Sequence, residues 1–231
     1  MIIGSGLLAK AFPPDYNNRD DVCIYAAGVS NSGCTDDYEF DREKERLEYA
    51  LASSQEKTVF VYFSTCSIYD EELSDSAYVK HKLAMEELVA NRTNHLIFRL
   101  PQVVGYTPNP HTLLNFLYAR ITRSERFHIW KNAQRNVIDV EDVASISAVF
   151  INDPAVRDVI INIANPENYS VLDIVTTFER VLHKKAICDY ENKGGEYAID
   201  VGQMQSVADK SGAVFDEAYL EKIISKYYAS K

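Results

Sequence analysis

The sequence predicts an α/β fold in which helices cover both faces of a doubly wound parallel sheet. Apolar runs of strand length alternate with longer runs whose apolar residues recur at helical spacing. A glycine-rich turn follows the first apolar run directly, and a chain of 231 residues can bury a core without disulfides. We expect a main domain over residues 1–150, and a last sheet strand with a small C-terminal lobe in residues 151–231.

The individual elements follow from the same two patterns. Short apolar and β-branched runs predict strands at residues 1–3, 21–27, 58–64, 95–99 and 159–163. Amphipathic runs predict helices at residues 36–52, 78–90, 139–150, 170–182 and 216–228, the fourth with Ser170 as its N-cap. The many charges of residues 36–52 are interpreted as the solvent-exposed face of a helix and not as a binding site.

Composition narrows the class of partner. A formal net charge of -10 disfavours nucleic acids and anionic membrane surfaces, which attract basic patches. No apolar stretch approaches the ~20 residues of a membrane span, and no basic segment precedes an apolar one at the N-terminus. The four cysteines lack CxxC spacing, which disfavours a metal or redox site. We therefore expect a reduced, cytoplasmic protein that binds neither nucleic acid nor membrane and holds no metal.

The first candidate motif is the turn Gly4-Ser5-Gly6-Leu7-Leu8-Ala9. It follows a predicted strand and opens a predicted helix, which is the context of a dinucleotide-binding turn. Glycine allows a tight turn and a close approach of a pyrophosphate, and a small sixth residue lets the helix pack on the strand. A simple strand-to-helix turn would use similar residues, so this motif alone leaves both interpretations open.

The second motif is Tyr78-Val79-Lys80-His81-Lys82. The spacing of four places Tyr78 and Lys82 on one face of a helix. A neighbouring ammonium group favours the phenolate and lowers the pKa of a tyrosine, which suits it to acid/base catalysis near neutral pH. Such a pair is often a plain surface pair. Here the hydroxyl-rich segment 64–69 follows a predicted strand just upstream, where a hydroxyl could contact the same substrate oxygen.

Two later segments complete an ordered series. Residues 99–105 read Arg-Leu-Pro-Gln-Val-Val-Gly, and residues 135–143 read Arg-Asn-Val-Ile-Asp-Val-Glu-Asp-Val. Together with the turn, residues 21–28, residues 64–69 and the Tyr–Lys pair, this series resembles the extended short-chain dehydrogenase/reductase family. That family comprises sugar-nucleotide epimerases, dehydratases and 4-ketoreductases. The resemblance spans most of the chain and implies a Rossmann-like sheet with a C-terminal substrate lobe.

The resemblance also assigns roles to matching residues. Tyr78 would be the acid/base group, Lys82 would lower its pKa and hold the nicotinamide ribose, and Thr65 falls at the family's catalytic Ser or Thr. NAD or NADP would contact Tyr78 and Lys82 and, beside them, Gly4, Ser5, Gly6, Leu7, Leu8, Ala26, Ala27, Gly28 and Pro101. The nucleotide-sugar substrate would contact Ser67 and Arg135, although a surface salt bridge explains Arg135 equally well.

The sequence departs from the family directly after the turn. The Pro-rich residues 12–20 lead at once into the predicted strand at 21–27, so a strand-helix-strand unit is missing. We expect the sheet to be shortened at one edge, with the strand at 1–3 exposed there and the adenosine end of the cofactor poorly held. An exposed edge strand is usually covered by another part of the structure, and a second subunit is one candidate for this. Asp70 also replaces the expected glycine after Tyr69.

The resemblance implies an NAD(P)-dependent epimerase, dehydratase or 4-ketoreductase that acts on a sugar nucleotide, with a role in making surface-polysaccharide sugars. The alternative is a non-catalytic protein that keeps the fold and binds a nucleotide or sugar. The missing unit favours the alternative. The presence of Tyr78, Lys82 and Thr65 together favours the enzyme, because a binding module has no need of all three.

Overall fold

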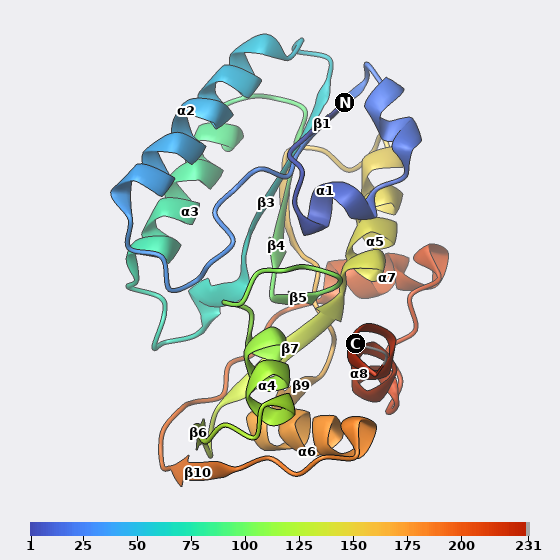
Figure 1. Cartoon of the computed structure of the whole chain (residues 1–231). Helices are drawn as coiled ribbons and strands as arrows, with labels where there is room; N and C mark the ends of the chain where they lie inside the picture. The colour runs from blue at the N-terminus through green and yellow to red at the C-terminus, as the bar shows by residue number, and fades with distance from the viewer. Residues whose placement is uncertain (230–231) are drawn as a thin grey trace.

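The computed structural model describes residues 1–229 and is built around a five-stranded parallel sheet (Figure 1). The strand order is β1-β2-β3-β4-β8, with every neighbouring pair parallel. The strands are β1 (Ile2–Ile3), β2 (Val22–Tyr25), β3 (Val59–Thr65), β4 (His95–Leu100) and β8 (Val159–Asn162). All five lie within the runs predicted from the sequence or within one residue of them.

Helices cover both faces of this sheet, as predicted. Figure 1 shows α2 (Asp37–Ser53) and α3 (Ala77–Ala90) on one face, and α1 (Leu7–Ala11) and α5 (Val140–Asn152) on the other. A further helix, α7 (Gly202–Ser211), packs against α5 and β8. Because both faces are covered, every residue of the central strand β3 is buried.

Strand β1 lies at the edge of the sheet, which confirms the expected shortening. From α1 the chain continues through one 3-10 turn, η1 (Pro14–Asn18), and enters β2 directly. Strand β2 pairs with β1, and no other strand of residues 1–229 pairs with β1. The strands that would lie beyond β1 and support the adenosine side of a dinucleotide are therefore absent from the described chain.

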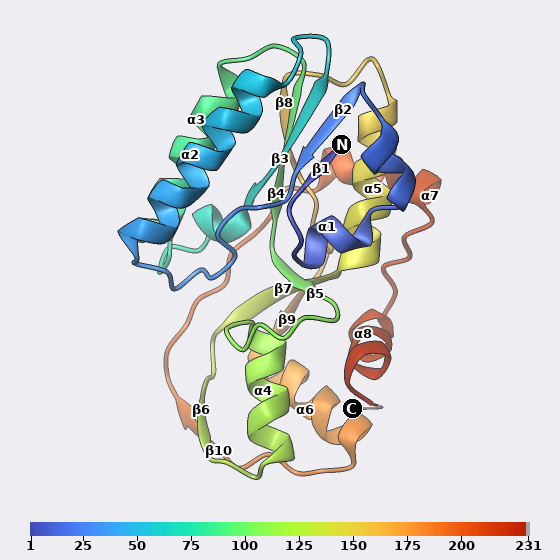
Figure 2. The same ribbon diagram turned by 45° about the horizontal axis from the view of Figure 1, so that its top comes forward.

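A second lobe lies below the sheet in Figures 1 and 2. It has its own apolar core. Residues on both sides of position 150 belong to it. Its strands are β5 (Gln102–Val104), β6 (Phe127–Trp130), β7 (Gln134–Asp139), β9 (Asn168–Ser170) and β10 (Cys188–Glu191). Its helices are α4 (Leu113–Thr122), α6 (Val171–Leu182) and α8 (Tyr219–Tyr228). Strand β5 pairs with β7, β7 with β9, and β6 with β10.

Side chains of helix α8 form a cluster of hydrogen bonds with residues at the start of α5. Asp139 caps α5 by accepting a hydrogen bond from the Glu141 amide. Its two carboxylate oxygens accept hydrogen bonds from the Tyr227 hydroxyl at 2.6 Å and the Lys226 ammonium at 2.9 Å. The Tyr219 hydroxyl donates to Asp142 at 2.6 Å and accepts from the backbone N–H of Asp139 at 3.0 Å. Side chains of α8 thus join the second lobe to a helix that covers the sheet.

No helix in the part of the chain that the structure describes is long and apolar enough to cross a membrane. The four cysteines form no disulfide.

Candidate active site

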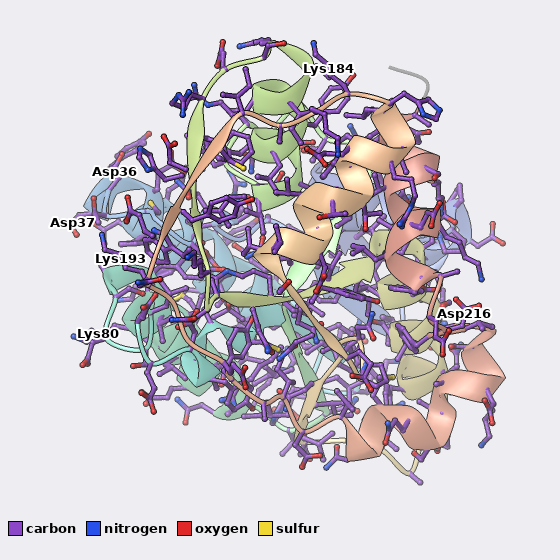
Figure 3. All side chains as sticks on the ribbon, turned by 90° about the horizontal axis from the view of Figure 1, so that it is seen from below. Asp36, Asp37, Lys80, Lys184, Lys193 and Asp216 are labelled. Atoms are coloured by element: carbon purple, nitrogen blue, oxygen red, sulfur yellow. The ribbon has the colours of Figure 1, made fainter. Side chains whose placement is uncertain are left out.

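Helix α3 carries the tyrosine and lysine singled out by the sequence. Ser76 caps the helix by accepting a hydrogen bond from the Val79 amide. Tyr78 and Lys82, one turn apart, both face inward and are only 6% and 3% exposed. Lys80, between them in sequence, points to solvent with 66% of its side chain exposed, and Figure 3 shows it at the periphery of the molecule. The helical spacing therefore separates one buried lysine from one exposed lysine.

A cavity of about 270 Å³ opens at the carboxyl ends of β2, β3 and β4. This is where open parallel sheets bind their ligands. Ten of the residues predicted for the site lie on its wall: Gly6, Leu7, Leu8, Ala26, Gly28, Thr65, Ser67, Tyr78, Lys82 and Pro101. The turn after β1 and the Tyr–Lys pair thus face one space, although they are about 70 residues apart in sequence.

Three predicted cofactor contacts do not lie on this wall. Gly4 has a φ of +134°, and a Cβ there would lie 2.3 Å from the carbonyl oxygen of Ala26, so this glycine is needed for the turn itself. Ser5 is exposed. Ala27 packs instead into the apolar cluster between the sheet and helices α2 and α3. The turn therefore offers the cavity only its second glycine and the two leucines that follow.

Two features of the wall fit a bound dinucleotide. A Cβ on Gly6 would meet no atom within 4 Å, so the protein itself does not require a glycine there, and the backbone is open to a phosphate. Ser64 is buried, its Oγ has no hydrogen-bond partner within residues 1–229, and it lies on the cavity wall. Buried hydroxyls normally have partners, and because this oxygen exposes almost no surface, a ligand group could become its partner only after the side chain rotates toward the cavity. Helix α1 has only five residues.

Lys82 is held by three acceptors. Its ammonium donates to Glu43 Oε1 at 3.0 Å, to the Tyr62 hydroxyl at 3.1 Å and to the carbonyl oxygen of Phe63 at 3.4 Å. These three bonds match the three N–H donors of a lysine. A Cβ on Gly28 would lie 2.6 Å from this ammonium and 2.7 Å from Glu43 Oε1, so a side chain at position 28 would have to displace one member of the pair.

Glu43 lies on α2 and is 2% exposed, so the interpretation of the 36–52 charges as a solvent-exposed face is wrong at this position. It accepts hydrogen bonds from the Val29 amide at 2.6 Å and the Tyr62 hydroxyl at 2.8 Å, and lies 3.0 Å from His81 Nε2. Burial acts to raise the pKa of Glu43, but the charge of Lys82 and the hydrogen bonds outweigh it and lower that pKa to about 2. The carboxylate is therefore ionised at neutral pH.

The pKa of Tyr78 lies above its ordinary value in this structure, whereas the sequence predicted that Lys82 would lower it. Burial of the phenol is the main cause of this raised pKa, a hydrogen bond with Thr65 acts in the opposite direction, and the charge of Glu43 raises it further. The lowering expected from Lys82 is outweighed by this burial, and the charge of Lys82 is partly balanced by Glu43 at 3.0 Å. Tyr78 is therefore a neutral phenol at neutral pH.

Thr65 and Ser67 form a small hydroxyl group beside Tyr78. The Thr65 hydroxyl donates to Ser67 Oγ at 2.9 Å and accepts from the Ser67 amide at 3.0 Å, which caps the 3-10 turn η2 (Cys66–Tyr69). Both line the cavity. The turn chemistry expected after β3 is present, and it aims two hydroxyls at the space in front of Tyr78.

Arg135 lies in a second cavity of about 510 Å³ between the lobes. Its guanidinium is 3.6 Å from Asp70 and donates to the carbonyl oxygen of Gln134 at 2.7 Å. The partly exposed rings of Trp130 and Phe116 line the same cavity. The two cavities share the wall residues Ser32, Gln102 and His111. Arg135 is thus separate from Tyr78 but opens on the adjoining space.

Glu43 and Tyr62 were not predicted from the sequence, and Ser64 was predicted only as a member of the hydroxyl-rich segment 64–69. Glu43 had a detectable signal, because it falls three residues after Phe40 and four before Leu47, on the apolar face of its helix. Tyr62 and Ser64 lie in a continuously buried strand, where side-chain alternation does not reveal which residue reaches a ligand. No cluster of three or more metal-ligating side chains occurs in residues 1–229.

Comparison with known structures supports the fold. The dTDP-glucose 4,6-dehydratase of Bacillus anthracis in complex with NAD is 17% identical, with a TM-score of 0.72 over 94% of this chain and 76% of that chain. The UDP-glucuronic acid 4-epimerase of Bacillus cereus with UDP-glucuronic acid and NAD is 19% identical, with a TM-score of 0.69 over 90% and 76%. The RMD protein of Pseudomonas aeruginosa with NADPH is 16% identical, with a TM-score of 0.68 over 91% and 80%.

Sequence comparison assigns the family. No curated protein sequence matches the chain significantly. The model of the NAD dependent epimerase/dehydratase family matches residues 21–164, which is more than half of the chain. The match begins just before β2 and runs past β8, so it includes Thr65, Tyr78 and Lys82. The chain therefore belongs to the NAD dependent epimerase/dehydratase family.

Proposed function

We propose that this protein is a nicotinamide-dependent enzyme that acts on a sugar nucleotide, with Tyr78 as its acid/base group. The observation that carries the proposal is the convergence of Tyr78, Lys82 and Thr65 on one cavity that also borders the turn after β1. A nicotinamide dinucleotide would supply hydride transfer at a sugar carbon. The protein's own part is to orient the sugar hydroxyl or keto oxygen and to move its proton.

In this assignment the hydroxyls of Thr65 and Tyr78 bind one substrate oxygen, and Tyr78 exchanges the proton with it. The side of the cofactor that carries the nicotinamide would lie along Gly6, Ala26 and Pro101, all on the wall of the 270 Å³ cavity. The unpartnered hydroxyl of Ser64 is available for a further bond. Where bound ligands exclude water from this pocket, each of these hydrogen bonds is strengthened.

The adjoining 510 Å³ cavity suits the nucleotide part of the substrate. The Arg135 guanidinium fits a diphosphate, because its fork of donors matches phosphate oxygens. Trp130 and Phe116 offer flat apolar faces for a base. The relatives bound to sugar nucleotides support this substrate class, and the family resemblance suggests that the product serves surface-polysaccharide synthesis. Epimerisation, dehydration and ketone reduction of a sugar each include a hydride transfer at carbon and a proton transfer at oxygen, so this group of residues does not choose among them.

The test is a titration of the protein with NAD(H) and NADP(H), followed by nicotinamide fluorescence, in the presence and absence of a panel of nucleotide sugars. Turnover of one such pair is expected. Tyr78→Phe should lower kcat by ~10²-fold or more because the proton has no other carrier. The matched control is Tyr49→Phe, since Tyr49 is 76% exposed on α2. Full activity in Tyr78→Phe would refute the assignment.

A second candidate function, a non-catalytic nucleotide- or sugar-binding protein, is favoured by one observation. Strand β1 ends the sheet, so the adenosine side of a cofactor lacks its usual support. This candidate predicts that a nucleotide sugar binds in the absence of any nicotinamide cofactor and that no turnover follows with either one. The proposed enzyme requires both ligands to bind together.

A further inference from the structure

The 510 Å³ cavity between the lobes has little positive charge to offer an anion. Among residues 1–229, Arg135 is the only lysine or arginine on its wall. The wall also carries the exposed carboxylate of Glu72, so the formal charges of these two side chains cancel. A phosphate group that enters this cavity therefore depends on Arg135 for its electrostatic attraction.

A second carboxylate already faces Arg135. The Oδ2 atom of Asp70 lies 3.6 Å from Nη1 of Arg135, and the two side chains are only 10% and 18% exposed. The pair joins the two lobes, because Asp70 follows the turn η2 of the main lobe and Arg135 lies on β7. Water screens a pair with so little exposure only weakly, so Asp70 balances part of the charge that an incoming phosphate would meet.

Asp70 is held in this position by its own turn. Its Oδ1 atom accepts a hydrogen bond from the backbone N–H of Glu72 at 3.1 Å. Its backbone N–H donates to the carbonyl oxygen of Ser67 at 3.2 Å, and its carbonyl oxygen accepts from the backbone N–H of Leu73 at 2.9 Å. Because these hydrogen bonds fix the residue, the carboxylate stays beside Arg135 when a ligand arrives.

The Arg135 guanidinium nevertheless keeps donors for a ligand. Its Nη1 atom, which faces Asp70, donates to the carbonyl oxygen of Gln134 at 2.7 Å. No hydrogen bond within the described part of the chain engages its Nε or Nη2 atoms. Since an arginine has five N–H donors in a planar fork, a phosphate can bind one edge of the guanidinium while Asp70 stays at the other.

We propose that Asp70 shares Arg135 with the phosphate part of the nucleotide sugar and thereby lowers the affinity of the cavity for that part. This inference rests on the proposed function and adds what limits the strength of substrate binding. A diphosphate ester carries more negative charge than one guanidinium balances, and here it also meets a fixed carboxylate. Flat contacts with Trp130 and Phe116 then carry a larger share of nucleotide recognition.

The test is calorimetric titration of the full chain with two probes, uridine diphosphate and thymidine diphosphate. Asp70→Asn removes the charge and keeps the Oδ1 acceptor for the turn. It should tighten binding by about tenfold, which lies between the small effect of an exposed ion pair and the large effect of a buried one. Asp70→Ser also keeps an acceptor for the backbone N–H of Glu72 and should tighten binding too, so either folded variant tests the proposal.

Glu72→Gln is the matched control. Glu72 is an exposed carboxylate on the same wall, whereas the ion pair of Arg135 is formed by Asp70, so the effect of Glu72→Gln should be about twofold or less. In an Arg135→Gln background, Asp70→Asn should have no larger effect than this control. Unchanged or weaker binding by folded Asp70→Asn would overturn the proposal. So would a tenfold gain that persists without Arg135, or a failure of both probes to bind any of these proteins.

Turnover separates this inference from the proposed function. If Asp70→Asn binds the probes more tightly but no nucleotide sugar reacts with NAD(H) or NADP(H) in either protein, the proposed function fails and the role of Asp70 stands. If nucleotide sugars react, and both their KM and the affinity for the probes are the same in the two proteins, the proposed function stands and the role of Asp70 fails.

Discussion

The Ser64 hydroxyl is the clearest residue-scale indication of a ligand. It is buried without a partner in the ligand-free protein, so Ser64→Ala should leave the unfolding free energy unchanged or raise it by up to about 1 kcal/mol. The same change should weaken binding of the cofactor or the sugar nucleotide by about 1 kcal/mol, roughly fivefold. Denaturant unfolding and calorimetry measure the two effects.

Ser147→Ala is the matched control for that prediction. The Ser147 hydroxyl on α5 is also buried and unpartnered within the described residues, but it does not line the cavity. This variant should change stability in a similar way and leave ligand binding unaltered. Equal effects of both variants on binding would mean that Ser64 contacts no ligand.

The ion pair of Glu43 makes stability depend on pH. The pKa of Glu43 is lowered from its ordinary value of 4.5 to about 2, so its contribution is fully present above 4.5 and is lost as pH falls toward 2. Glu43→Gln should cost about 3 kcal/mol at neutral pH, because Lys82 is left as an unpaired buried charge. Denaturant unfolding at a series of pH values should show this difference shrinking below 4.5. A difference that stays constant down to pH 2 would contradict the assignment.

At this scale the sequence revealed the residues that share a helical face and missed those that need tertiary contacts. Tyr78 and Lys82 were predicted together because a spacing of four is a local property of a helix. The neutralisation of Lys82 could not be predicted, since its partner Glu43 lies 39 positions away on another helix. The expected lowering of the Tyr78 pKa failed mainly because burial of the phenol, which also depends on tertiary contacts, raises that pKa.

At the scale of elements, the buried strands were predicted well and the lobe strands were not. Strands β2, β3 and β4 are continuous apolar runs, which a sequence displays plainly. The lobe strands β5, β9 and β10 have three or four residues each and are mostly half-buried, so no apolar pattern marks them. Helix α4 was also missed, because it depends on packing within the lobe rather than on a strong local pattern.

The edge position of β1 leads to a prediction about ligand length. In dinucleotide-binding folds, an acidic residue that follows the glycine-rich turn binds the adenosine ribose, and the missing unit would have carried it. The loss of that carboxylate costs ~1.5–3 kcal/mol, which is roughly 10- to 150-fold in affinity. We expect NAD(H) to bind more weakly than micromolar, and reduced nicotinamide mononucleotide to bind within about tenfold of NADH, because the adenosine half finds no strand beyond β1. Calorimetry compares the two. Tight 1:1 binding of NADH by a demonstrable monomer would contradict this, whereas tight binding only in an oligomer would indicate a site completed by a second subunit.

At the scale of the whole molecule, the two lobes are tied together through α8. Tyr219→Phe removes the hydroxyl that donates to Asp142 and accepts from the Asp139 amide, which should cost about 2 kcal/mol of unfolding free energy. Tyr38→Phe is the control, because Tyr38 is 70% exposed. Both variants are compared by denaturant unfolding. A loss in Tyr219→Phe no larger than in the control would mean that this cluster contributes nothing to the joining of the lobes.

The contacts of α8 with Asp139 also matter during synthesis of the chain, because α8 is made last among the described helices. When β8 leaves the ribosome, all five strands of the sheet have been made, but the residues that hold Asp139 lie 87 and 88 positions after it. Until α8 appears, the apolar face of α6 lacks its main cover, since Ile223, Ile224 and Tyr227 belong to the same core as Ile174 and Phe178. A nascent chain that contains β8 but not yet α8 therefore holds every strand of the sheet, while the apolar face of α6 still lacks this cover.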